Sequence, residues 1–180
     1  MKRPKRKYEC ASAYKRDQGY GANLLGSLDN PDGLQEWSDR SNEIRALLLT
    51  ESPRGAALIA RAYTESLLDA CLRKAERDKR RNYSRALRGG LGFKIETCLK
   101  DRLVPRSLAT KLCCIKEVGD AFAHNHQIGT FMNPVVRAEM RRLQRSATNQ
   151  RGGFTEKKGK FILIVAMQLV IINTGSLRNL

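Results

Sequence analysis

Three side chains in this sequence have types and spacings that could carry chemistry: Glu65, Asp120 and His124. Glu65 falls inside an apolar stripe, between Ala62 and Leu68, so its carboxylate is directed at the core or a cleft and needs a partner there. Asp120 and His124 are one helical turn apart, so they share a helix face and can form a hydrogen bond. We expect a polar network between two core helices, in which Glu65 accepts a hydrogen bond from His124 or from a backbone group.

Helical spacing of apolar residues predicts the elements that position these groups. Ser52 has the character of an N-cap, and Pro53 suits the first position of a helix that runs to about Lys74. Two-residue alternation is nowhere sustained, so we expect an all-α fold, an antiparallel bundle of about five to seven helices with short connections. Other helices are predicted from about Trp37, over roughly 91–102, from Pro105 to about His124 and from Pro134 to about Arg145, with a basic connector at 73–88.

The two ends of the chain differ from this pattern. Residues 1–40 are rich in Gly, Asn, Asp, Ser, Lys and Arg and carry no sustained apolar period, so we expect a mobile basic arm there. Residues 41–175 are expected to form one helical domain. Residues 161–172 are almost entirely apolar and must be buried; a strand is an alternative for them because they are rich in β-branched side chains.

The charge is unusual for a chain of 180 residues, since 34 Lys and Arg against 18 Asp and Glu give +16. Such a balance favours an anionic partner, either nucleic acid bound with low sequence specificity or an acidic protein. The arm could alternatively engage anionic lipids. The cations predicted to bind nucleic acid are Lys2, Arg3, Lys5, Arg6, Lys7, Arg77, Lys79, Arg80, Arg81, Arg85, Arg141, Arg142 and Arg145.

Several kinds of site and segment are excluded by motif and spacing. The longest apolar run is too short to span a bilayer and no secretory signal is present, so we expect a cytoplasmic protein. The chain has only two histidines, and they are not spaced as in the H-E-x-x-H motif, so a metalloprotease site of that type is excluded. We expect His124 and His126 to be capping or surface residues rather than metal ligands. The five cysteines form no C-x-x-C pair. Cys71, Cys98, Cys113 and Cys114 are expected to be small core residues, with a redox role for Cys113 and Cys114 as the alternative. We predict no metal and no cofactor.

Three segments carry a family resemblance. Residues 52–69 open a helix with Arg-Gly-Ala and contain an inward Glu after a Tyr; residues 89–125 run from Gly-Gly-Leu-Gly-Phe to Asp-Ala-Phe-Ala-His-Asn; residues 161–165 begin the closing apolar element. Together they resemble the mannitol operon repressor family of bacteria, over roughly residues 47–172. The resemblance implies an all-helical cytoplasmic bundle linked to repression of transcription, in a family without a recognisable helix-turn-helix.

The segment that ends at His124 also looks like the closing motif of the HEPN helical superfamily. Its RNases use an Arg, four to six positions before a His, to stabilise phosphate charge while the His exchanges protons. Here Gly119 and Asp120 stand in place of the Arg and its polar neighbour, so Asp120 adds negative charge where a scissile phosphate would lie. Arg61 or Lys116 could replace the missing cation, although Lys116 lies one turn before Asp120 and can pair with it.

We therefore expect a non-enzymatic, repressor-like transcriptional regulator without catalytic residues. One alternative is a divergent HEPN-type RNase, in which His124, Asp120 and Glu65 would carry the reaction. A second alternative is a pure protein-interaction module whose charge serves solubility. The apolar last helix makes a homodimer an open option for each of these.

Overall fold

The computed structural model describes residues 31–79, 81–148, 154–155, 159–160 and 162–167. In these parts of the chain every regular element is an α-helix, which confirms the all-α prediction. The described residues at 159–160 and 162–167 are helical too, so the last apolar element contains a helix and the strand alternative is wrong there. The labelled helices are α1 (Pro31–Thr50), α2 (Pro53–Lys79), α3 (Ser84–Leu87), α4 (Leu91–Lys100), α5 (Arg106–His124) and α6 (Pro134–Thr148).

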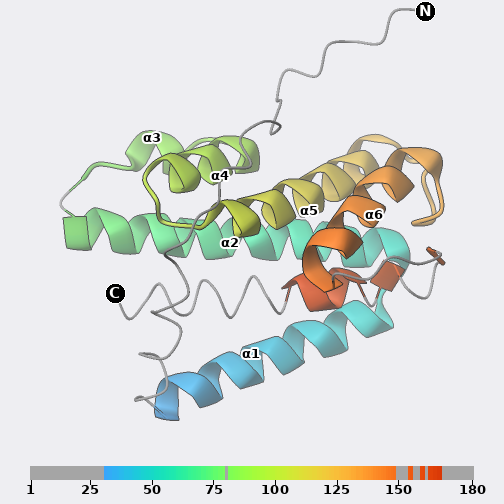
Figure 1. Ribbon diagram of the computed structural model, residues 1–180, viewed down its shortest axis with the longest axis horizontal. Helices are drawn as coiled ribbons and strands as arrows, with labels where there is room; N and C mark the ends of the chain where they lie inside the picture. The colour runs from blue at the N-terminus through green and yellow to red at the C-terminus, as the bar shows by residue number, and fades with distance from the viewer. Residues whose placement is uncertain (1–30, 80, 149–153, 156–158, 161, 168–180) are drawn as a thin grey trace, which may run out of the picture.

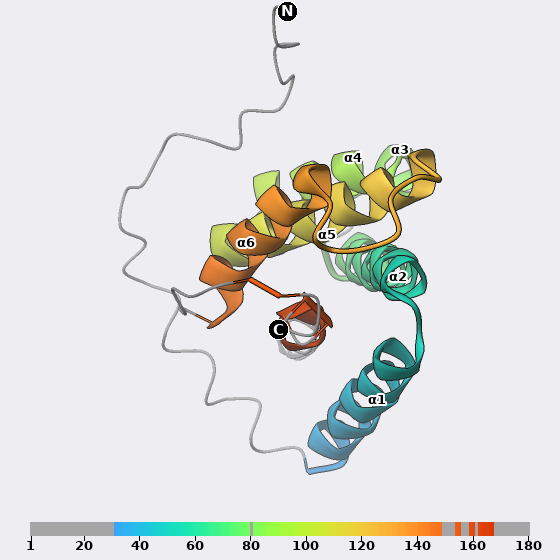
Figure 2. The ribbon, with the colours of Figure 1, turned by 90° about the vertical axis from the view of Figure 1, so that its right-hand side faces the viewer.

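The long helix α2 packs against α1, α3, α4 and α5 (Figure 1). Helix α5 runs antiparallel beside it, with α3 and α4 on one side and α6 crossing α5. Figure 2 shows α1 at the far side of α2 from α4, with the helical residues of 159–167 between α6 and α1. Lys160 Nζ donates to the Leu49 carbonyl at 3.2 Å, which ties this last segment to the end of α1.

The core is formed by apolar side chains from every one of these helices. Fully buried large residues include Leu68 of α2, Leu91 of α4 and Leu112 of α5. The rings of Phe122 and Phe131 meet edge to face at 5.6 Å between centroids, which joins α5 to the loop before α6. Burial of this apolar surface is the main force that holds the bundle together.

The start of α2 has the cap that the sequence predicts. Ser52 Oγ accepts a hydrogen bond from the Gly55 amide at 3.0 Å, which satisfies one of the free amides of the first turn. At the same end of the bundle, the Arg54 guanidinium donates to the carbonyls of Asn125 at 2.6 Å and Ile128 at 3.3 Å, just after the end of α5. The first turn of α2 is thereby fixed to the end of α5 at His124, the predicted boundary.

Helix α4 ends in a turn with a left-handed residue. Arg102 has φ 56°, a conformation that costs an L-residue free energy. The Leu103 amide donates to the Cys98 carbonyl at 2.8 Å across this turn, so a carbonyl of the last turn is satisfied. The turn directs the chain back into α5.

Two predicted boundaries are wrong. Helix α1 already begins at Pro31, so residues 31–40 belong to a helix and not to an arm; a proline suits the first turn because its missing amide hydrogen would be unpaired there. Helix α2 continues to Lys79, because the buried Ala75 extends the apolar stripe beyond Lys74 into the predicted connector. Residues 1–30 of the predicted arm lie outside the described residues.

Within the described part of the chain, no helix is both long enough and apolar enough to cross a membrane.

Candidate nucleic-acid interface

A buried lysine joins α2 to α4. Only 4% of the Lys94 side chain is exposed, and its Nζ lies 2.9 Å from Glu65 Oε1 and 2.8 Å from Asp69 Oδ1. The two carboxylates are one helical turn apart on α2, so both face the same ammonium group. Glu65 therefore has the partner that its place in an apolar stripe requires, and that partner is a cation of α4.

An arginine then joins the same carboxylate to α5. Arg61 Nε donates to Asp120 Oδ1 at 2.7 Å, and its guanidinium lies 3.6 Å from Glu65 Oε2. Lys116 Nζ donates to the other oxygen of Asp120 at 2.8 Å. Alternating charges from Asp69 through Lys94, Glu65, Arg61 and Asp120 to Lys116 thus connect α2, α4 and α5; we name these six residues the ionic ladder.

Two glycines give the ladder the space that it occupies. A Cβ atom on Gly119 would lie 2.6 Å from Cβ and 2.7 Å from Cδ of Arg61, so the stem of Arg61 passes directly over this glycine. A Cβ atom on Gly92 would lie 3.1 Å from Cε of Lys116. Glycine at 119 lets α5 approach α2 closely enough for Arg61 to reach Asp120.

The ladder shifts the pKa of its members. Burial disfavours the charged form of Asp120, but the hydrogen bonds from Lys116 and Arg61 outweigh it, so the pKa of Asp120 lies below its ordinary value of 3.8. Burial likewise acts against the charged Lys94, yet its hydrogen bonds with Asp69 and Glu65 raise its pKa above 10.5. These groups are therefore held in their charged forms at neutral pH.

The predicted network of Glu65, Asp120 and His124 needs a correction. The structure joins Glu65 to Asp120 through Arg61, whereas His124 is exposed and lies outside the contacts of the described ladder. Arg61 and Lys116 outcompete His124 for Asp120 because both are charged donors at short range. Lys94 and Asp69 were missed, although Lys94 lies three residues after Leu91 and four before Cys98, on the buried face of α4.

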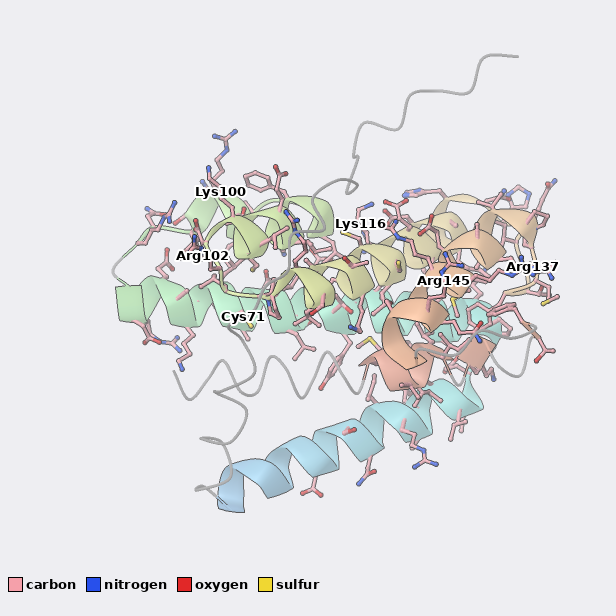
Figure 3. The ribbon with its side chains drawn as sticks, in the orientation of Figure 1. Cys71, Lys100, Arg102, Lys116, Arg137 and Arg145 are labelled. Atoms are coloured by element: carbon pink, nitrogen blue, oxygen red, sulfur yellow. The ribbon has the colours of Figure 1, made fainter. Side chains whose placement is uncertain are left out.

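Exposed cations are also found at one end of the molecule, on elements that pack against one another. The end of α2, the connector at 81–83, α3, the end of α4 and the turn after it lie together at one end of the molecule, where Figure 3 labels Lys100 and Arg102. Each of these elements carries exposed basic side chains. We define the cationic end as Arg77, Arg81, Arg85, Arg88, Lys100 and Arg102.

Most of this charge is uncompensated. Arg81 Nη1 binds Asp101 Oδ1 at 2.8 Å and remains 58% exposed. In the described part of the chain, none of the other five cations forms an ion pair. Glu96 is exposed on α4 and lowers the local charge, although it forms no ion pair with any of these described cations. The cationic end can therefore bind an anion through several side chains at once.

The predicted nucleic-acid-binding residues divide into three groups. Arg77, Arg81 and Arg85 belong to the cationic end, which sequence reasoning found only in part. Arg88 was assigned only to the connector, and Lys100 and Arg102 were missed because they are distant in the sequence; the Arg81–Asp101 pair brings their segment to α3. The cations outside the described residues are Lys2, Arg3, Lys5, Arg6, Lys7 and Arg80, together with the side chain of Lys79.

Helix α6 carries the third group. Arg141 and Arg145 are exposed, whereas Arg142 is half-buried and lies 3.6 Å from Glu139 Oε2. Figure 3 shows Arg137 and Arg145 on the side of the molecule away from Lys100. This second basic surface is smaller than the cationic end, and its charge is partly compensated.

The cysteines have the character of core residues. Burial raises the pKa of the Cys98 and Cys114 thiols to about 12, so both stay protonated at neutral pH and are poor nucleophiles. Cys71 and Cys113 are half-buried and form no disulfide within the described residues, and Cys10 lies outside them. In the described part of the chain, no cluster of His, Cys, Asp and Glu could hold a metal ion.

Comparisons with protein-family models, with curated proteins and with solved structures found no match for this chain.

Proposed function

We propose that this protein is a non-enzymatic, repressor-like regulator that binds nucleic acid through the cationic end. The observation that carries the proposal is the gathering of six exposed cations on α2, α3, α4 and their connections, five of them without a carboxylate partner in the described part of the chain. Such a surface neutralises backbone phosphates and positions a protein on nucleic acid with little dependence on base sequence. The resemblance to the mannitol operon repressor family is the reason for proposing a role in the regulation of transcription.

The ionic ladder supports a binding role over catalysis. Arg61 and Lys116 are the cations that could replace the arginine of a HEPN-type RNase, and both are bound to Asp120. A cation held by a carboxylate has little charge left to stabilise a phosphate. His124 on the next turn then lacks the cationic partner that RNA cleavage requires.

Charge reversal tests the location of the interface. The double variant Arg77→Glu and Lys100→Glu should bind a labelled 30-mer oligonucleotide at least tenfold more weakly than the wild type, because two phosphate contacts are lost and two repulsions gained. The matched variant Arg141→Glu and Arg145→Glu changes the net charge equally on α6 and should lose less. Fluorescence anisotropy at one fixed salt concentration measures both.

Each result has a definite meaning. Equal weakening by both variants would show that net charge and not the cationic end governs binding. Unchanged binding in the first variant would contradict the proposal. The same samples run on a denaturing gel should show intact RNA, and cleavage that disappears in His124→Ala would establish the RNase alternative instead.

A further inference from the structure

An exposed aromatic ring lies within reach of the cationic end. Phe93, in the first turn of α4, is 41% exposed although most large apolar residues of the described chain are buried. An exposed phenyl ring costs hydration free energy and contributes little to the core. The exposed part of the ring is therefore available for contact with a partner.

The ring is held in place from two sides. The guanidinium carbon of Arg85 lies 5.8 Å from the centroid of the Phe93 ring, within cation–π range. A Cβ atom on Gly89 would lie only 2.6 Å from Cδ1 of the ring, so the ring packs against the backbone of Gly89. Phe93 and Arg85 thus form a pair, in which a flat ring and a planar cation lie together at the surface.

The surroundings of the pair are cationic and open. Arg88 lies between α3 and α4, and Lys100 follows Phe93 by two turns of α4, about 10 Å along the helix. Next to the ring, a Cβ atom on Gly90 would meet no atom within 4 Å, so the space beside the N-terminus of α4 is free. Phosphates at Arg88 and Lys100 would flank a base placed at the ring.

We propose that Phe93 and Arg85 form a stacking platform for an unpaired base, so that the cationic end prefers single-stranded nucleic acid to a duplex. A base within a duplex has both faces covered by its neighbours and cannot reach the ring, whereas an unpaired base exposes a face that stacks on aromatic side chains and guanidinium groups. The inference rests on the proposed function, since the surrounding cations must first hold the phosphate backbone.

The test compares single and double strands of one sequence, as DNA and as RNA. Phe93→Leu keeps an apolar side chain and removes the ring; it should weaken binding of the single-stranded 15-mers about tenfold and leave duplex binding within about twofold. Phe93→Trp keeps an aromatic ring and should bind the single strands as tightly as the wild type does. A 2-aminopurine base in the single strand should lose fluorescence on binding to the wild type and keep it with Phe93→Leu.

Every outcome separates the two proposals. Single-strand binding that Phe93→Leu leaves unchanged would overturn the stacking platform and leave the cationic end intact. An equal loss for single strand and duplex would also overturn it, because a stacking contact acts only on unpaired bases. If the wild type binds none of the four probes, the proposed nucleic-acid-binding function itself is contradicted. Loss restricted to DNA or to RNA would establish which strand the platform accepts.

Discussion

Arg61 crosses the face of Gly119 to bind Asp120, so that a residue without a side chain on α5 determines where a guanidinium of α2 lies. The same guanidinium lies 3.6 Å from Glu65, whose carboxylate binds the buried Lys94. The close contact between α2 and α5 at Gly119 thus supports the ionic ladder, which connects α2, α4 and α5.

Gly119→Ala should lower the free energy of unfolding by about 1–3 kcal/mol, because the new methyl group would overlap the stem of Arg61 and separate α2 from α5. Urea unfolding measures the change. Gly129→Ala is the control, since a Cβ atom there meets nothing within 4 Å and stability should stay within about 0.5 kcal/mol. Equal effects at the two glycines would contradict the close approach at Gly119.

Lys94→Met should lower the free energy of unfolding by about 3 kcal/mol, because Glu65 and Asp69 would keep two like charges without the cation between them. Adding Glu65→Gln and Asp69→Asn removes that repulsion and should recover most of the loss. Both variants can be compared in the same urea series. A single variant as stable as the wild type would show that Lys94 contributes nothing through its charge.

Asp120 should give the protein an acid-sensitive part of its stability. Burial acts to raise the pKa of Asp120, but Lys116 and Arg61 lower it below 3.8, so the folded state favours the ionised carboxylate. The resulting stabilisation is present above the unfolded-state pKa and is lost as the pH falls through it towards the folded-state pKa. Asp120→Asn should thus be less stable than the wild type at pH 7, and the difference should narrow from about pH 5 downward. A difference that stays constant to pH 3 would contradict this.

Arg102→Gly should raise the free energy of unfolding by about 1 kcal/mol, because glycine adopts φ 56° without the cost that an L-residue carries. Arg102→Ala removes the same charge and keeps the left-handed conformation, so it should not be stabilised. Both variants lose one cation of the cationic end and should bind nucleic acid equally less tightly. Thermal unfolding measures the change in stability, and fluorescence anisotropy measures the change in affinity for nucleic acid.

Much of the helical fold could be predicted from the spacing of apolar residues. The errors in the predicted helix boundaries have local causes. The boundaries at Pro53, Leu91 and His124 follow from a cap, a glycine pair and a turn, which are all short-range signals. Helix α2 was cut short because its last turns are charged, although the buried Ala75 continues the apolar period. The many charged residues there indicated a connector, whereas the 3.6-residue period of the buried side chains correctly indicated a helix.

The candidate site could be predicted only where its residues are close in the sequence. Arg77, Arg81 and Arg85 form a dense basic stretch, but Lys100 and Arg102 join them only because α4 returns to α3. The expected partner of Glu65 was His124 or a backbone group, whereas the structure places Lys94 of α4 there, since the helices that become neighbours depend on tertiary packing that spacing does not encode. The exposed ring of Phe93 could not be separated from a core residue by its spacing alone.

The measurement that tests the central claim most directly is the salt dependence of single-strand binding, recorded by anisotropy across roughly 50–300 mM salt. If the six cations of the cationic end each neutralise one phosphate, the plot of log affinity against log salt concentration should have a slope of about −4. The variant Arg77→Glu and Lys100→Glu should have a shallower slope. A slope near zero in the wild type, or the same slope in both proteins, would contradict the account.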